Sequence, residues 1–240
     1  MQTKTIKVDT ADGPMDLYEA VPEGGAQRGV VVIQEAFGVN DHIEDVTRRL
    51  ADAGWHALAP HVFHRTGDPV IPYDDIQSVM PHTRALTGDG LLEDLDACLA
   101  HLGERGLLPD RVAITGFCMG GTVTYFAACR RPLGAAVTFY GAGVAEGRWK
   151  GVPSMLELAP ELQTPWLGLF GDLDQGIPVE DVERLREAVG SAKVPAEIVR
   201  YPEAGHGFHC DQRPASYHEA SARDGWARAL AWFEEHVPRS

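Results

Sequence analysis

The segment Gly116-Phe117-Cys118-Met119-Gly120 places a cysteine between two glycines, after an apolar run and before a stretch of helical period. This is the G-x-S-x-G pattern with cysteine in place of serine, in which a strand turns sharply into a helix at the nucleophile. Side chains at the glycines would clash there, and the free N–H groups of the helix face the nucleophile. A buried structural cysteine is the alternative. The strand–turn–helix context favours Cys118 as nucleophile and the Met119 N–H as an oxyanion donor.

A cysteine nucleophile needs a histidine base and an acid that orients it, and this pattern occurs in the chain order nucleophile, acid, histidine. Asp172 and Asp174 both follow an apolar run, where α/β sheets bind ligands. Position leaves both open, and either could instead cap the helix expected from about Val179. His206 lies between two glycines after the last predicted strand, which favours it over the nearby His209, whose alternative role is a solvated loop residue.

The elements that must position these residues alternate along the chain. Residues 5–20 alternate polar and apolar types around Asp12-Gly13, which predicts an antiparallel hairpin. Short apolar runs predict buried parallel strands at 29–34, 56–60, 111–115, 135–140, 165–170 and 196–201. Stretches of helical period lie at about 41–53, 91–105, 119–130, 179–190 and 215–236. This alternation predicts an α/β fold with a mostly parallel central sheet and helices on both faces.

The least regular stretch is residues 61–90, which contains Pro69, Pro72, Pro81 and scattered glycines. Irregular segments of this length are often functional in compact domains, so we expect a lid or a pocket wall. No repeat, low-complexity tract or linker interrupts the chain, and residues 1–240 are therefore expected to form one domain.

The composition excludes several classes of protein. Hydrophobic residues make up 44% of the 240 residues and charged residues 23%, unlike disordered or fibrous chains. The net charge of −14 argues against nucleic acid or an anionic membrane as partner. The first residues show no secretory signal, and no apolar run reaches the roughly 20 residues of a membrane span. A cytoplasmic protein with reduced thiols is expected.

The other three cysteines do not have the short paired spacings of a zinc site. Cys98 and Cys129 lie within helical patterns and are expected in the core. Cys210 follows His206 closely and is expected to be exposed and oxidisable.

Over about residues 28–236 the chain resembles the dienelactone hydrolase family of α/β-hydrolases. The resemblance rests jointly on the segments 34–40, 116–121, 174–178 and 204–208. It implies the α/β-hydrolase fold and a Cys-His-Asp triad that maps onto Cys118, His206 and Asp174. The family's aspartate precedes a proline, here Pro178, at a fixed spacing, so the resemblance selects Asp174 over Asp172.

The resemblance also implies a role for Glu35, whose counterpart contacts the resting thiol and helps to deprotonate it when substrate arrives. The thiolate is the nucleophile, and a desolvated carboxylate is basic enough to take the thiol proton. The alternative is that Glu35 only orders the loop after the first parallel strand. The N–H of Ala36 in this loop is the expected second oxyanion donor.

Substrate-binding residues are implied less directly. Relatives hold a lactone carboxylate with arginines and a tyrosine, and Arg84, Arg213 and Tyr217 are the candidates here. The alternative for each is a surface residue on a solvated loop, which we favour for Arg84 because its region is poorly matched. His61, where relatives often have aspartate, is three residues from His64, but no third ligand is visible and no metal site is expected.

We therefore expect a carboxylic ester hydrolase that cleaves an ester or lactone through a thiol acyl-enzyme, without a metal or organic cofactor. The implied reaction is dienelactone to maleylacetate, and the implied partner is a small, anionic molecule. A carboxylesterase with another substrate is one alternative. A non-catalytic thiol-based binding or redox-sensing protein is another, and the complete set of Cys118, Asp174, His206 and Glu35 argues against it. The sequence leaves the oligomeric state open and is compatible with a monomer.

Overall fold

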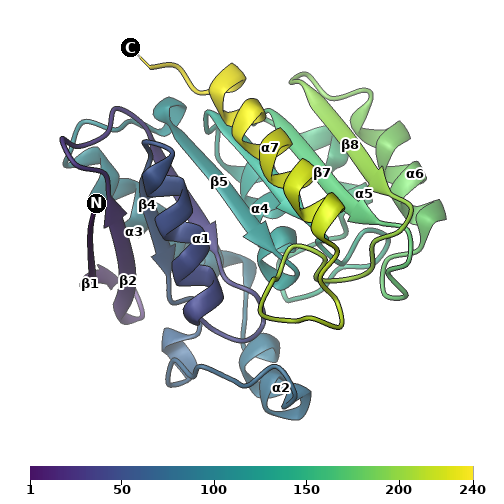
Figure 1. Cartoon of the computed structure of the whole chain (residues 1–240), viewed down its shortest axis with the longest axis horizontal. Helices are drawn as coiled ribbons and strands as arrows, with labels where there is room; N and C mark the ends of the chain where they lie inside the picture. The colour runs from purple at the N-terminus through teal and green to yellow at the C-terminus, as the bar shows by residue number, and fades with distance from the viewer. Residues whose placement is uncertain (240) are drawn as a thin grey trace.

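The computed structural model describes residues 1–239 and contains one eight-stranded sheet in the order β1-β2-β4-β3-β5-β6-β7-β8 (Figure 1). The first two strands form an antiparallel hairpin, the second pairs antiparallel with the fourth, and all other neighbours are parallel. The strands are β1 Gln2–Thr10, β2 Gly13–Val21, β3 Gly29–Ile33, β4 His56–Pro60, β5 Val112–Phe117, β6 Ala135–Phe139, β7 Trp166–Gly171 and β8 Ala196–Tyr201.

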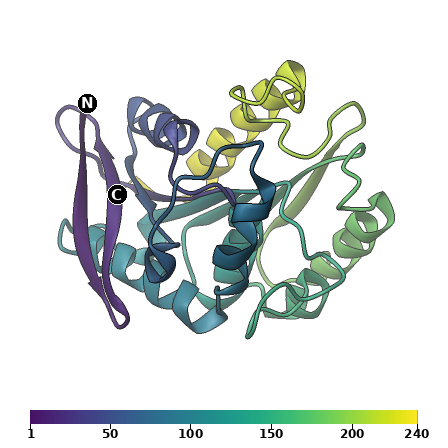
Figure 2. The ribbon, with the colours of Figure 1, turned by 90° about the horizontal axis from the view of Figure 1, so that it is seen from below.

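Helices cover both faces of the sheet, as Figures 1 and 2 show. One face is covered by α1 (Asp41–Asp52) and α7 (Glu219–His236), and the other by α3 (Gly88–Gly103), α4 (Met119–Arg130) and α6 (Val179–Val189). The predicted α/β architecture is thus confirmed. Within residues 1–239, no helix has both the length and the apolar character needed to span a membrane.

The shorter helices are α2 (Ile76–Arg84) and α5 (Met155–Leu158), and single 3₁₀ turns cover His64–Thr66, Pro109–Arg111 and Ala159–Glu161. Strands β3 to β7 are buried along their whole length, because helices cover both sides of them. This burial explains why their sequences are continuous apolar runs. The edge strand β1 instead alternates exposed and half-buried residues in its second half.

The segment expected to be irregular contains α2, which lies beyond the carboxyl ends of the parallel strands (Figure 1). Only Val79 of this helix is buried, so its sequence lacks the apolar periodicity that would predict it. Val79 packs with Phe37 and Ile71 in a small apolar cluster that is separate from the main core. Asp75 caps the helix by accepting a hydrogen bond from the Ser78 N–H at 3.3 Å.

The cysteines outside the nucleophile motif are all buried. This confirms the core positions predicted for Cys98 and Cys129, but the prediction that Cys210 is exposed is wrong. The loop that carries Cys210 folds inward, and the thiol donates a hydrogen bond to the Tyr73 hydroxyl at 3.3 Å.

Candidate active site

Cys118 lies at the turn between β5 and α4, as its sequence motif predicts. Its backbone has φ 55° and ψ −116°, a strained conformation for a residue with a side chain. A Cβ atom at Gly116 would collide with the carbonyl of Gly120, and one at Gly120 would collide with the carbonyl of Ile33. The two glycines therefore allow the close approach that holds Cys118 at the apex.

His206 and Asp174 form a hydrogen-bonded pair after the last two strands of the sheet. His206 Nδ1 lies 2.6 Å from Asp174 Oδ2, and the other carboxylate oxygen of Asp174 accepts the Gly176 N–H at 2.9 Å. Partial burial opposes protonation of His206, but the charge of a Cys118 thiolate and the Asp174 carboxylate outweigh it and raise the pKa of His206 to about 10. The arrangement favours the imidazolium form of His206.

Asp172, the other candidate acid, is used elsewhere. Arg200 donates to both of its carboxylate oxygens, Nε to Oδ1 at 2.7 Å and an Nη2 bond to Oδ2 at 2.6 Å. Neither aspartate caps α6, whose N-cap residue is Pro178. The two carboxylates, only two residues apart, thus face an arginine in one case and a histidine in the other.

His209 is buried against the nucleophile turn rather than solvated in a loop. Its ring stacks on Phe117, with the ring centroids 5.1 Å apart, and its Nδ1 has no hydrogen-bond partner among residues 1–239. Burial, with smaller effects of the nearby His42 and Arg49, lowers the pKa of His209 to about 3. The side chain is therefore a neutral part of the core and does not compete with His206 as the base.

This burial predicts an acid-sensitive fold. Because the folded-state pKa of His209 is lowered, its stabilising contribution is complete above pH 6.5 and is lost as the pH falls toward 3. One such group adds a slope of up to about 1.4 kcal/mol per pH unit to the free energy of unfolding. Urea denaturation between pH 7 and pH 4 measures the slope, which His209→Gln should reduce. His61→Gln, at a partly exposed histidine, is the control, and an unchanged slope in His209→Gln would contradict the assignment.

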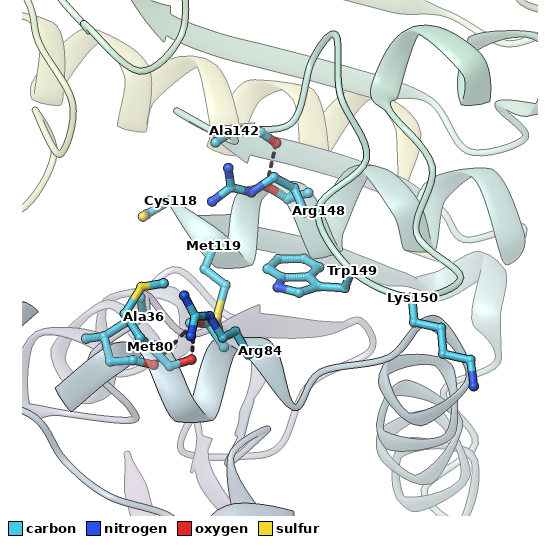
Figure 3. Close-up of a pocket in the computed structure, with 12 residues that line it drawn as sticks. Ala36, Met80, Arg84, Cys118, Met119, Ala142, Arg148, Trp149 and Lys150 are labelled. Atoms are coloured by element: carbon cyan, nitrogen blue, oxygen red, sulfur yellow. Dashed lines mark hydrogen bonds between the residues drawn. The ribbon is translucent and has the colours of Figure 1, made fainter. Parts of the chain in front are cut away.

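The two expected oxyanion donors face the same space. Ala36 follows β3 and Met119 begins α4, and both line a cavity of about 440 Å³ beside Cys118 (Figure 3). Neither backbone N–H donates to an acceptor in the described chain, so both are free to bind an oxyanion.

We call this cavity the chamber, and two further segments of the chain form its walls. Helix α2 contributes Val79, Met80, Thr83 and Arg84, so the segment expected to be a lid or pocket wall does form a wall, and Arg84 lines it. The connection between β6 and α5 contributes Arg148, Trp149 and Lys150, which the sequence analysis missed. Their signal was a cationic and aromatic run that follows the carboxyl end of a parallel strand.

Arg213 and Tyr217 do not line the chamber. The guanidinium of Arg213 lies over the rings of Phe37 and Tyr73, at 5.5 and 5.2 Å from their centroids. Tyr217 follows in the same loop, where its N–H donates to the Arg213 carbonyl. The structure therefore brings one of the three predicted substrate-binding residues to the chamber.

Glu35 is completely buried, and neither of its carboxylate oxygens has a hydrogen-bond partner within residues 1–239. The contact with the Cys118 thiol that the resemblance implies is thus not formed in this structure. The hydroxyl of Tyr140 is likewise buried without a hydrogen-bond partner in the described part of the chain. Burial and then the negative charge of Glu35 raise the pKa of Cys210 to about 11. The Cys210 thiol near this carboxylate therefore stays protonated at neutral pH.

Possible metal ligands lie away from the chamber. His61 pairs with Asp68 and His64 with Asp94, so these two histidines do not share a site.

A second group comprises Glu19, His56 and His101, whose potential ligand atoms lie within 4.8 Å of one another. Lys4 and Arg105 also approach Glu19, at 3.1 and 3.4 Å. Although burial opposes it, hydrogen bonds from the histidines and Lys4 lower the pKa of Glu19 to about 2, so the carboxylate is already neutralised by its neighbours.

Comparisons with known proteins agree with this architecture. The model of the dienelactone hydrolase family matches residues 15–237. A Salmonella typhimurium protein named "Putative carboxymethylenebutenolidase" is 43% identical over 226 residues, which cover 92% of this chain and 83% of the relative. A protein of the same name from Methylorubrum extorquens is 40% identical over 235 residues, covering 96% and 80%.

Solved structures show the same relationship. The crystal structure of a "Putative Dienelactone Hydrolase" from Klebsiella pneumoniae subsp. pneumoniae superposes with a TM-score of 0.90, at 40% identity and 98% coverage of both chains. A dienelactone hydrolase-like promiscuous phosphotriesterase from metagenomic libraries gives 0.79, at 26% identity and coverage of 99% and 100%. With its α/β-hydrolase fold and a family match over most of its length, the chain belongs to the dienelactone hydrolase family and is a hydrolase.

Proposed function

We propose that this hydrolase cleaves a lactone or carboxylic ester through a thiol acyl-enzyme, with Cys118 as nucleophile, His206 as base and Asp174 as the orienting acid. The observation that carries the proposal is the 2.6 Å pair of His206 and Asp174 next to a cysteine at a strained turn. The chamber of about 440 Å³ beside this cysteine has the size of a small-molecule site.

The thiolate of Cys118 attacks the carbonyl carbon, and the oxygen takes up negative charge between the N–H groups of Ala36 and Met119. The intermediate collapses with cleavage of the C–O bond, and the His206 imidazolium gives its proton to the departing alkoxide. In a lactone, this alkoxide stays attached to the acyl chain.

His206, now neutral, takes a proton from water as the water oxygen attacks the thioester carbonyl. The second tetrahedral intermediate releases the carboxylic acid and the Cys118 thiolate, and His206 keeps the proton. Asp174 holds the ring in the orientation that both steps need, because its carboxylate binds Nδ1. The cycle consumes one water and returns Cys118 as a thiolate beside the His206 imidazolium.

Steady-state turnover of a panel of lactones and simple esters tests the proposal. Dienelactone hydrolysis to maleylacetate is the reaction that the family suggests. Preferred turnover of simple esters instead would favour a carboxylesterase. Stoichiometric acylation of Cys118 without turnover would contradict the hydrolytic cycle and support a thiol-based binding or redox-sensing protein.

Glu35 is proposed to gate the thiol. A buried carboxylate disfavours a nearby thiolate through like-charge repulsion, while His206 favours it. Glu35→Gln removes the repulsion and should speed alkylation of the free enzyme by iodoacetamide at neutral pH. When substrate binds, the Glu35 carboxylate accepts the proton of the Cys118 thiol and returns it when the thiolate is released at the end of the cycle. The same change removes this proton acceptor and should slow lactone turnover.

The opposite movement of the two rates separates gating from damage to the fold, which would lower turnover alone. Asp41→Asn is a matched control, because Asp41 is an exposed carboxylate at the start of α1. If Glu35→Gln changes both rates by less than about twofold relative to this control, Glu35 only orders its loop.

A further inference from the structure

The chamber concentrates cations that have no partner. Most lysine and arginine side chains of this acidic protein form an ion pair. Within residues 1–239, the exceptions are Arg84, Arg111, Arg148, Lys150, Lys193 and Arg213. Three of these line the chamber, namely Arg84, Arg148 and Lys150. In a chain of net charge −14, this grouping gives the chamber a local positive charge.

No aspartate or glutamate lines the chamber in the described part of the chain. The cations therefore have no counterion of their own in it, and a ligand that carries negative charge is favoured there. Low-dielectric walls strengthen this preference, because they focus the field of the cations into the cleft.

Arg84 and Arg148 approach the chamber from different elements. In the view of Figure 3, Arg148 lies above the indole of Trp149 and Arg84 lies below it, while Lys150 extends away from Cys118. Arg84 belongs to α2, and Arg148 to the connection between β6 and α5. The chamber therefore has two separate guanidinium groups, one on each of these elements.

The connection that carries Arg148 and Trp149 is anchored at several points. The Gly88 N–H donates to the Lys150 carbonyl at 2.8 Å, and Trp149 forms a bridge with Val152. The aliphatic part of Arg148 packs so closely on Gly143 that a Cβ atom there would meet Arg148 Cγ at 2.5 Å. These contacts hold the backbone of the connection and the aliphatic part of Arg148 in place before a ligand arrives.

We propose that Arg148 and Trp149 form a second anion subsite, which binds a flat, unsaturated group bearing its own carboxylate, while Arg84 binds a carboxylate on the other part of the substrate. The inference rests on the proposed function and adds to it a preference for esters or lactones that carry two anionic groups. The indole stacks on the flat group, and the guanidinium forms charge-assisted hydrogen bonds to the carboxylate. Lys150, at the outer side, adds attraction for the incoming anion.

Aryl esters of butyric and succinic acid test the two subsites separately. The aryl group is 4-carboxyphenyl or its neutral isostere 4-carbamoylphenyl, and succinate adds a carboxylate on the acyl side. We expect the aryl carboxylate to raise kcat/KM about tenfold over the carbamoyl ester, the usual effect of a charge-assisted hydrogen bond. Arg148→Gln should remove this preference, and Arg84→Gln should instead remove the preference for succinate.

Lys193→Gln is the matched control, because Lys193 is also unpaired but does not line the chamber. It should leave both preference ratios at the wild-type values. If Lys193→Gln and Arg148→Gln lose the aryl-carboxylate preference equally, the preference is caused by the net charge of the protein and not by Arg148. This result would overturn the subsite. So would turnover of all four esters without any preference, although the proposed hydrolytic function would then stand.

Binding of terephthalate, a flat dicarboxylate that cannot be hydrolysed, gives a readout independent of activity. Calorimetry should show Kd about tenfold higher in Arg148→Gln than in Lys193→Gln. If no ester is turned over but terephthalate binding depends on Arg148, the proposed function fails and the subsite stands. Binding that is the same in both variants would overturn the subsite.

Discussion

Replacing Cys118 by alanine is expected to abolish acyl-enzyme formation and to lower kcat by several orders of magnitude, as loss of a nucleophile does in triad enzymes. The exchange removes one sulfur atom and keeps the Cβ atom, so the turn between Gly116 and Gly120 can retain its shape. Mass spectrometry of the enzyme mixed with an activated ester should show an acyl adduct in the wild type and none in the variant.

Cys210→Ala provides the matched control. Cys210 is buried and hydrogen-bonded to Tyr73, so this variant tests the loss of a thiol without loss of the nucleophile. It should still form the acyl adduct on Cys118. Turnover close to wild type in Cys118→Ala, or an acyl adduct on another residue, would remove Cys118 from the mechanism.

Asp174→Asn is expected to lower kcat on the order of 10⁴-fold, because an amide donor in place of the carboxylate favours the wrong tautomer of His206. Asp172→Asn should cost far less, since its partner is Arg200 and not His206. The two substitutions are chemically identical and lie two residues apart, so each controls for the other. Steady-state kinetics on a single ester gives the ranking.

A thermal melt of both variants completes this comparison. Asp172→Asn weakens a partly exposed ion pair with Arg200, so a small loss of stability is expected there. If Asp172→Asn lowers kcat more than Asp174→Asn while both remain folded, the acid has been assigned to the wrong carboxylate.

The parts of the site that local sequence determines were predicted well. The turn at Cys118 needs glycine on both sides, because backbone carbonyl groups lie too close to Gly116 and Gly120 to leave room for a Cβ atom. Five consecutive residues are therefore enough to predict this turn. The strands that become β4 and β8 were predicted with the bounds observed, since each is a short apolar run between breakers. The helix that becomes α4 also has the predicted bounds, and the remaining predicted boundaries differ from the structure by at most four residues, mostly at the ends of the hairpin and the helices.

The parts that depend on long-range packing were not predictable in the same way. Position after the strand does not distinguish Asp172 from Asp174, because their partners Arg200 and His206 lie 28 and 32 residues further along the chain. Only the spacing to Pro178, which the family resemblance supplies, favoured Asp174. To predict the wall formed by Arg148 and Trp149, one must know that the connection between β6 and α5 folds back to the cavity beside Cys118.

The separate apolar cluster of α2 has a consequence for how substrate reaches the chamber. The helix carries Val79 as its one buried residue, and this side chain packs on Phe37 and Ile71 outside the main core. Detaching α2 therefore breaks few apolar contacts and leaves the buried strands intact. Segments of this kind unfold locally at a small fraction of the global free energy of unfolding. Movement of the wall that carries Arg84 would therefore leave Cys118 and His206 in place, because the nucleophile and its base are held by the buried sheet and not by α2.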